Sequence, residues 1–442
     1  MHSRFKSVWW VVAGLMAATP ALAAGPLVPG GSPLPQTTDV DQTVDANSLE
    51  MYVTNLGSFG HHLRTGNPGG YFPRGTTKSV IFASGLWIGA QVEGEDGPRV
   101  AIAEYTQEFS PGVIQDDGTP SNAASSRYRV YKIQRGDTTS DDYLDWPFAD
   151  GAPADASDPG YDPNDPQTWK PLMLGDQSLW CVYNDADPAE HTAVAGNTAP
   201  LGLEVRQTVF AFDRQPPLGN MVFLKFEIIN KGDLTLDSTY VSLWSDPDIG
   251  GYTDDLVGCD TDLSLGFCYN STNDDELYGS APPAVGYDFF KGPANTYGIQ
   301  WPPGSGTVPD ELPMTSFNKY INGTDPYSAG ETYNYMRGLD IDGNPVVNEV
   351  TGETTTFFNS GDPVTGEGWL DTNPADRRFM LSAGPFQMAP GDTQEVVAGI
   401  IVAQGTDRLN SVSLLRQYDE QAQAVFDLDF NIPAPPPRPS LY

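Results

Sequence analysis

The sequence predicts an all-β fold, an antiparallel β-sandwich with long loops rich in Asp, Gly and Pro and one helix near the C-terminus. Three observations predict this fold. Short runs of β-branched and aromatic residues alternate with turn-forming residues along most of the chain. The 46 Gly and 39 Pro among 442 residues exceed the average usage of these residues in proteins. Hydrophobic residues make up 39% of the chain, which is enough to build a core and excludes wholesale disorder.

The first 23 residues have the layout of a secretory signal peptide. Two basic residues precede an apolar run over residues 8–16, and Ala21-Leu22-Ala23 matches a small-residue cleavage site. The apolar run is too short to span a membrane. We therefore expect an exported protein, secreted, extracellular or at the cell surface, with the periplasm as an alternative. No membrane insertion is expected after cleavage.

Residues 24–200 divide into a lead-in and an expected N-terminal β region. Residues 24–48 are rich in Pro, Gly and Thr without apolar periodicity, which predicts a flexible lead-in. The β region covers 49–200, and its strands are expected over 50–55, 79–93, 99–109, 127–133 and 178–183. Residues 137–170 form a turn-rich insertion between the last two of these strands.

The second region, 201–432, carries the clearest sandwich pattern. Residues 204–212, 221–232 and 236–244 are apolar runs separated by short turns, as is typical of antiparallel sheets in a sandwich. The segments 379–382 and 394–402 flank the turn Ala389-Pro390-Gly391-Asp392 and predict a further hairpin.

Residues 406–428 predict the one good helix. Its apolar residues recur every three or four positions and form a single face: Leu409, Val412, Leu415, Tyr418, Ala422 and Val425. Thr406 or Asp407 can cap its start. Residues 433–442 then form a Pro-rich linker, a composition typical of interdomain spacers. We therefore expect the natural chain to continue beyond Tyr442.

The net charge of the chain disfavours two classes of binding partner. There are 58 Asp and Glu against 23 Lys and Arg, giving a formal net charge of −35. Such a charge repels phosphate backbones and anionic lipids, so nucleic-acid and membrane-surface partners are disfavoured. Asp outnumbers Glu, 42 to 16. Short aspartate side chains favour turns and the oxygen coordination of cations.

The densest acidic segment predicts a calcium site. It places six carboxylates within seventeen residues: Asp246, Asp248, Asp254, Asp255, Asp260 and Asp262. Ca²⁺ takes six to eight oxygen ligands and would turn the mutual repulsion of these groups into a cross-link. The spacing is not that of an EF-hand, because Gly250 stands where the third ligand would be. The alternative is a solvated acidic loop without a metal.

Tryptophans in loops are the second set of candidate binding residues. Four of them lie in Pro-, Gly- and Asp-rich segments and could stack on a sugar: Trp146, Trp169, Trp301 and Trp369. The tryptophans within strand patterns, Trp87, Trp180 and Trp244, are expected in the core.

Motifs for catalysis and redox chemistry are absent from the sequence. It contains no H-E-x-x-H, G-x-S-x-G, G-x-x-x-x-G-K-[ST] or C-x-x-C pattern, so we expect no enzyme activity. The three cysteines, Cys181, Cys259 and Cys268, are an odd number, which argues against a disulfide framework. Whether Cys259 and Cys268 form a disulfide remains open from the sequence.

Six segments together carry a family resemblance: KSVIFASGLWIG (78–89), LWSDPDIG (243–250), GCDT (258–261), GDPVTGEGW (361–369), DRRFM (376–380) and GPFQMAPGD (384–392). Most of residues 50–432 thereby resemble the N-terminal β-rich region of large, uncharacterised secreted proteins of Bacteroidetes-like bacteria. The resemblance implies export as cargo of type IX secretion, often with downstream fibronectin type III modules and a sorting domain. Neither of those parts occurs in the 442 residues, and the resemblance supplies no catalytic residues.

Together these features predict a secreted or cell-surface structural or adhesive module, stabilised by Ca²⁺ and without catalytic activity. The alternative is a carbohydrate-binding or glycan-degradation accessory module that uses the loop tryptophans. An extracellular glycan or a surface protein is the expected partner. The sequence does not predict the oligomeric state.

Overall fold

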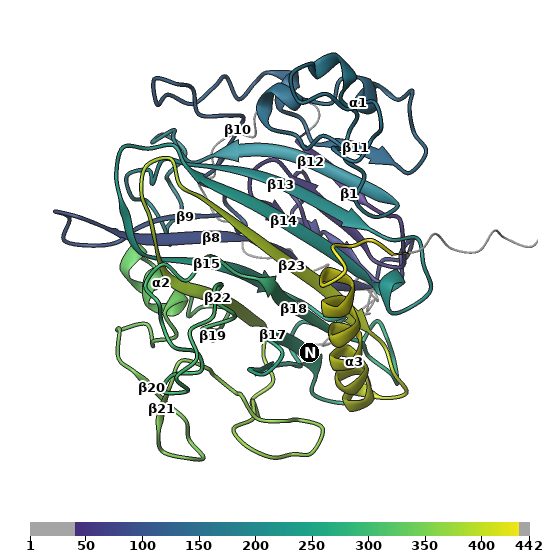
Figure 1. Ribbon diagram of the computed structural model, residues 1–442. Helices are drawn as coiled ribbons and strands as arrows, with labels where there is room; N and C mark the ends of the chain where they lie inside the picture. Colours follow the sequence, from purple (N-terminus) through teal and green to yellow (C-terminus); the bar gives the residue numbers. More distant parts are fainter. Residues whose placement is uncertain (1–39, 433–442) are drawn as a thin grey trace, which may run out of the picture.

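The computed structural model describes residues 40–432 and contains two large antiparallel β-sheets packed face to face (Figure 1). The predicted all-β sandwich is therefore confirmed. The predicted signal peptide, the lead-in as far as residue 39 and the Pro-rich linker over 433–442 lie outside the described residues. Both sheets take strands from residues before and after 200, so the two expected β regions contribute to the same two layers.

The first sheet has ten strands, with the order β19-β22-β15-β8-β3-β2-β6-β7 and with β1 beside β2 and β9 beside β8. Their bounds are β1 (Asp41–Val44), β2 (Glu50–Thr54), β3 (Ser58–Phe59), β6 (Gly70–Tyr71), β7 (Ser79–Ile81), β8 (Ala83–Val92), β9 (Arg99–Ile102), β15 (Leu236–Asp246), β19 (Ser316–Ile321) and β22 (Arg377–Met388).

The second sheet has nine strands, with the order β10-β12-β13-β14-β23-β18-β17-β16 and with β11 beside β12. Their bounds are β10 (Ser110–Pro111), β11 (Tyr131–Gln134), β12 (Gln177–Asn184), β13 (Leu203–Ala211), β14 (Met221–Asn230), β16 (Asp255–Asp260), β17 (Leu265–Asn270), β18 (Ala284–Lys291) and β23 (Thr393–Ala403). Two small ribbons complete the strands, β4 (His61–His62) with β5 (Asn67–Pro68) and β20 (Val346–Val347) with β21 (Thr354–Thr355).

The main core fills the space between the sheets. Alternate residues of each strand enter it, for example Leu243 and Leu381 from the first sheet and Leu224 and Ile400 from the second. The outer faces are also partly covered, so many strands are buried on both sides and their sequences read as continuous apolar runs. In β14, Phe223 faces outward while Leu224 faces the core.

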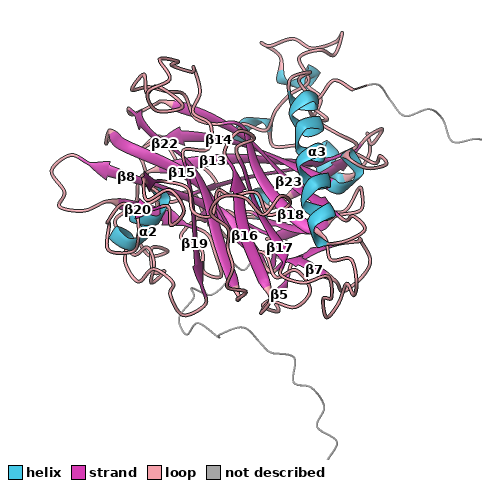
Figure 2. Cartoon of the chain, turned by 90° about the horizontal axis from the view of Figure 1, so that it is seen from below, coloured by secondary structure: helices cyan, strands magenta, loops and turns pink. Residues whose placement is uncertain are grey.

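Three helices accompany the sheets: α1 (Asp141–Leu144), α2 (Ala329–Met336) and α3 (Arg408–Phe426). Helix α3 covers the outer face of the second sheet over β17, β18 and β23, whereas α2 covers the outer face of the first sheet. Figure 2 shows α3 and α2 at opposite sides of the molecule. The predicted helix over 406–428 is confirmed, and Asp407 caps it by accepting from the amides of Leu409 (3.0 Å) and Asn410 (2.9 Å).

Three local predictions were wrong. Residues 41–44 of the expected lead-in form β1, which pairs with β2 along its whole length. Helix α2 was not predicted, because its eight residues are too few to show a clear helical period. The segments on either side of the turn at 389–392 do not form a hairpin: β22 pairs with β15 and β19 in the first sheet, and β23 pairs with β14 and β18 in the second.

The three cysteines are buried free thiols. Cys259 and Cys268 lie on neighbouring strands, but the residue opposite Cys268 is Val257 and the residue opposite Cys259 is Gly266. Within residues 40–432, none of the helices combines the length and apolar character needed to cross a bilayer.

Candidate metal centre

Asp246 is the last residue of β15 and lies on the outer face of the first sheet. Because side chains alternate along a strand, Leu243 and Ser245 face the second sheet while Trp244 and Asp246 face outward. The backbone oxygen of Asp246 accepts from the amide of Phe82 (2.9 Å), which fixes the strand end. The carboxylate is thus held by a central strand, and its side chain is only 2% exposed.

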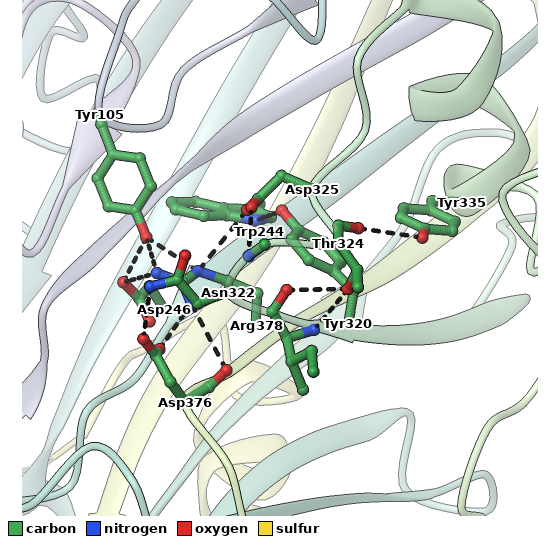
Figure 3. Close-up of polar contacts among 12 residues, drawn as sticks. Tyr105, Trp244, Asp246, Tyr320, Asn322, Thr324, Asp325, Tyr335, Asp376 and Arg378 are labelled. Atoms are coloured by element: carbon green, nitrogen blue, oxygen red, sulfur yellow. Dashed lines mark hydrogen bonds and ion pairs between the residues drawn. The ribbon is translucent and has the colours of Figure 1, made fainter. Parts of the chain in front are cut away.

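Strand β22 brings Arg378 and Asp376 to the same end of this sheet (Figure 3). It runs antiparallel to β15, so its first residues lie beside the last residue of β15. Arg378 donates to Oδ1 of Asp376 (2.6 Å) and to Oδ2 of Asp246 (3.3 Å). Asn322, from the loop after β19, donates to Oδ2 of Asp376 (3.0 Å).

Asp248 reaches the same place through a sharp turn. Its backbone has a positive φ of 46°, a left-handed conformation that Asp and Asn adopt more readily than other non-glycine residues. The next amide, that of Ile249, donates to Oδ2 of Asp255 (3.1 Å) and anchors the loop. The turn reverses the chain directly after β15 and brings the Asp248 carboxylate beside that of Asp246.

The three carboxylates form a compact triad. One oxygen from each of Asp246, Asp248 and Asp376 lies within 4.8 Å of the other two. Ligands on opposite sides of a Ca²⁺ ion, each about 2.4 Å away, are about 4.8 Å apart, so one ion could contact all three. Among the described residues, the buried Oδ1 atoms of Asp246 and Asp248 have no hydrogen-bond partner. Buried polar atoms are nearly always paired, so these two oxygens call for a ligand.

Tyr105 explains which oxygen of Asp246 remains available. Its hydroxyl donates to Oδ2 of Asp246 and accepts from Nη2 of Arg378 (2.9 Å). Its ring stands edge-on to that of Trp244, with centroids 5.3 Å apart. Tyr105 and Arg378 together hold Oδ2 of Asp246, and this leaves Oδ1 without a hydrogen-bond partner among the described residues.

Two more carboxyl groups surround the triad, those of Glu104 and Asp325. The five groups, Glu104, Asp246, Asp248, Asp325 and Asp376, are called the acidic centre below. Within the described residues, Arg378 is the cation that pairs with them, at 2.6 Å from Asp376 and 3.9 Å from Asp325. The acidic centre therefore carries a large excess of acidic groups in a mostly buried place.

The excess of acidic groups in the acidic centre is reflected in their raised pKa values. Burial raises the pKa of Asp246 to about 6, although Arg378 opposes the shift. Burial, followed by the charges of Asp246 and Asp255, raises the pKa of Asp248 well above its usual range. Burial and then the charge of Asp325 raise the pKa of Glu104 to about 8. Each of these groups resists ionisation until a positive charge arrives.

The donor set determines the class of ion that fits. All three ligand atoms are carboxylate oxygens, which suit hard cations such as Ca²⁺, Mg²⁺ and Mn²⁺ and not the softer ions that prefer sulfur. The buried acidic triad of Asp246, Asp248 and Asp376 could therefore hold a metal ion, and the ligands themselves do not distinguish among these hard cations.

The other predicted calcium ligands lie outside the triad, although Asp255 is near enough for its charge to raise the pKa of Asp248. Asp255 and Asp260 are the two ends of β16, and a six-residue strand separates its ends by about 16 Å. Asp260 pairs with Arg416 of α3 (3.0 Å), and Asp262 is exposed. Asp254 is half-buried next to Asp275, whose charge adds to burial in raising the pKa of Asp254. The structure thus brings together two of the six predicted aspartates.

The loop tryptophans also differ in exposure. Trp146 and Trp369 are buried, at 4% and 7% exposed, so neither presents a ring to solvent. Trp169 and Trp301 are half-buried. Trp169 stacks on Tyr161, with centroids 5.9 Å apart, and donates its Nε1–H to the backbone oxygen of Asp162 (2.8 Å).

Sequence reasoning missed Asp376, although a signal was present. Asp376, Arg377 and Arg378 are three consecutive charged residues directly before an apolar run that begins at Phe379. A charged group at the start of a buried strand is expected to have a partner. That partner lies about 130 residues away in the sequence, and only the pairing of β22 with β15 brings it close.

Comparisons with known proteins add no functional assignment. No protein-family model matches the chain, and no curated protein matches it. Among solved structures, the chain is similar to a putative aldose 1-epimerase from Escherichia coli K12 at 9% sequence identity. That match covers 82% of this chain and 98% of the other, with a TM-score of 0.26.

Proposed function

We propose that this protein is a secreted or cell-surface structural or adhesive module, and that its β-sandwich is stabilised by a calcium ion bound to Asp246, Asp248 and Asp376. One observation carries the proposal. The Asp246 side chain is 2% exposed, its Oδ1 has no partner in the described chain, and one of its oxygens lies within 4.8 Å of an oxygen of Asp248 and of Asp376.

The bound ion would act as a clamp between three segments of the chain. Asp246 ends β15, Asp248 belongs to the loop that leads to β16, and Asp376 directly precedes β22. β15 and β22 are neighbours in the first sheet, whereas β16 belongs to the second. The ion would therefore stabilise the end of the sandwich where the chain passes from one sheet to the other, and it would replace repulsion among carboxylates by attraction.

Calcium is the hard cation that best suits an exported protein with this site. Mg²⁺ requires a nearly octahedral arrangement and retains several waters, whereas Ca²⁺ accepts irregular sets of six to eight oxygens. Extracellular calcium modules bind with Kd values of about 10⁻⁴–10⁻³ M, for which three carboxylates and additional oxygens suffice. The predicted signal peptide supports an exported protein.

The test is thermal unfolding of the full chain in excess Ca²⁺ and in EDTA. At a calcium concentration of 100 times Kd, binding should add about 2.7 kcal/mol of stability, a Tm increase of a few degrees. Asp248→Asn should abolish this increase. Asp262→Asn, which removes an equal charge from an exposed site, should retain it. Equal calcium responses in Asp248→Asn and the wild type would contradict the proposal.

A carbohydrate-binding role is the alternative, and the stacked pair of Trp169 and Tyr161 favours it. The two rings are nearly parallel, at an interplanar angle of 29°, in a loop with many exposed residues. Such an aromatic pair can support the apolar face of a sugar ring. If so, Trp169→Ala should abolish retention of the chain on insoluble polysaccharides, while Trp301→Ala serves as the comparison. Equal retention of wild type and Trp169→Ala would reject this role.

A further inference from the structure

Two buried carboxyl groups face each other where α3 packs on the second sheet. Asp419 lies on the apolar face of α3, four residues after Leu415 and three before Ala422. Asp288 lies in β18. Each aspartate is 1% exposed, and the two side chains are hydrogen-bonded to each other. One oxygen of each has no other partner in the part of the chain that the structure describes.

Within residues 40–432, no basic group is among the charges that act on this pair. The neighbouring charges that act on Asp419 are those of Asp260 and Glu420, and both raise its pKa. Arg416, one turn earlier on α3, is already engaged by Asp260 (3.0 Å) and Asp362 (2.7 Å). Other titratable groups of the interface are the phenols of Tyr269 on β17 and Tyr418 on α3, and the guanidinium of Arg408, which lies over the Tyr269 ring near the start of the helix. On this face β23 presents apolar residues, namely Val397, Ile401 and Ala403.

Two carboxylates cannot both be ionised in such a place, because each would be buried beside a like charge. A shared proton removes the conflict, since a protonated carboxyl can donate to an ionised one. Burial raises the pKa of Asp419 to about 7. Burial and the neighbouring Asp419 raise the pKa of Asp288 well above its usual range. Near neutral pH the pair therefore keeps at least one proton.

We propose that the proton shared by Asp288 and Asp419 makes the docking of α3 on the sheet sensitive to pH, with the helix held tightly in acidic solution and progressively loosened in alkaline solution. The direction follows from linkage. The docked helix binds more protons than the undocked one, in which both carboxyls reach water, so docking weakens as protons are removed. Loosening would expose the apolar patch beneath α3, including Phe290, whose ring stacks on that of Phe426 in the helix.

This inference is independent of the proposed calcium site, and its test is made in EDTA. Hydrogen–deuterium exchange of the full chain is measured between pH 6 and pH 9 and corrected for the intrinsic pH dependence of exchange. Protection of the α3 amides should fall by about tenfold or more over this range, because one unit of pKa shift corresponds to about tenfold in the coupled equilibrium. Amides of β14 serve as the reference for global unfolding.

The decisive variant is Asp288→Asn. The asparagine amide donates to Asp419 at every pH, so it replaces the shared proton by a permanent donor. Protection of α3 at pH 9 should then be about tenfold above that of the wild type. Asp419→Asn reverses the direction of the same hydrogen bond and should have the same effect, which provides a second variant if the first fails to fold. Asp427→Asn, an exposed position at the end of the same helix, is the matched control and should follow the wild type.

The outcomes separate the proposal from a purely structural role. Loss of pH dependence in either asparagine variant, with the control unchanged, supports it. A variant that retains the wild-type pH dependence of α3 protection overturns it. So does a wild-type chain in which α3 protection does not change between pH 6 and pH 9.

Discussion

Arg377 and Arg378 are neighbours at the start of β22, yet their electrostatic surroundings are opposite. Arg377 shares the buried carboxylate of Asp371 with Lys319, at 2.7 and 3.0 Å. The other oxygen of Asp371 accepts from the amide of Val257 in the second sheet (3.2 Å). Arg378 instead points to the outer face and meets the acidic centre.

The difference between these two clusters shows how to distinguish a structural ion pair from a binding site. On the inner side, two cations share one carboxylate, and both oxygens of Asp371 are hydrogen-bonded. On the outer side, one cation faces five carboxyl groups, and two buried oxygens have no partner among the described residues. The inner carboxylate is fully paired, although Nε of Arg377 lacks a partner among the described residues. The outer cluster instead leaves two buried carboxylate oxygens that a further cation could engage.

The largest expected effect comes from breaking the inner cluster. Asp371→Asn leaves the buried Arg377 and the half-buried Lys319 without a counter-charge, and removing one partner of a buried ion pair costs about 3–5 kcal/mol. Urea unfolding should show the same loss in Ca²⁺ and in EDTA. A loss that occurs only in Ca²⁺ would mean that the inner cluster belongs to the metal centre, and the comparison would fail.

A smaller effect is expected when the outer cation is removed. In EDTA, Arg378→Gln should destabilise the protein by about 2–3 kcal/mol, since the acidic centre then has no positive charge. Calcium should recover most of that loss and should bind about tenfold more tightly than to the wild type, because a competing cation is gone. Isothermal titration calorimetry measures the calcium affinity. Weaker calcium binding in the variant would show that Arg378 does not compete with the ion for the acidic centre.

The smallest effect concerns Glu104, whose pKa is raised to about 8 mainly by burial. Its pKa in the unfolded chain is about 4.3, so the folded state keeps a proton that the unfolded state loses. Stability is therefore lost as the pH rises from about 4 through 8. Relative to the wild type, Glu104→Gln should gain about 1 kcal/mol of folding stability as the pH rises over this range. The gain is smaller than the pKa shift alone implies, because solvent screens the half-buried Glu104. Tm values in EDTA between pH 4 and pH 9 measure this, and parallel curves would refute it.

The fold class could be predicted because its signals are local. Alternating apolar residues and turn residues identify strands, and the apolar face of 409–425 together with the cap at Asp407 identifies α3. Which strands pair is a different matter. The turn at 389–392 has the sequence of a hairpin turn, but the strands on either side of it separate into different sheets. The turn residues are the same whether the flanking strands pair with each other or separate, so long-range packing decides which strands pair.

The candidate site was predictable in part for the same reason. Asp246 and Asp248 are two residues apart, so their proximity is visible in the sequence. Asp376 joins them through strand pairing over a long separation, and Tyr105 selects the available oxygen from yet another segment. Conversely, the closely spaced Asp255 and Asp260 are carried apart by an extended strand. Acidic residues that are close together in the sequence are therefore not always close together in the folded structure.

Asn230 connects two of the places where the chain passes between the sheets. Its side-chain amide donates to the backbone oxygens of Leu234 (2.8 Å) and Met388 (3.2 Å). Its backbone amide donates to the backbone oxygen of Asp392 (2.9 Å). The crossing after β14 and the crossing after β22 therefore lie side by side. During synthesis, however, β14 and β15 emerge well over a hundred residues before their partners β23 and β22. Folding must wait for these late strands, and such long-range pairing makes it slow and leaves strand edges open to aggregation in the meantime.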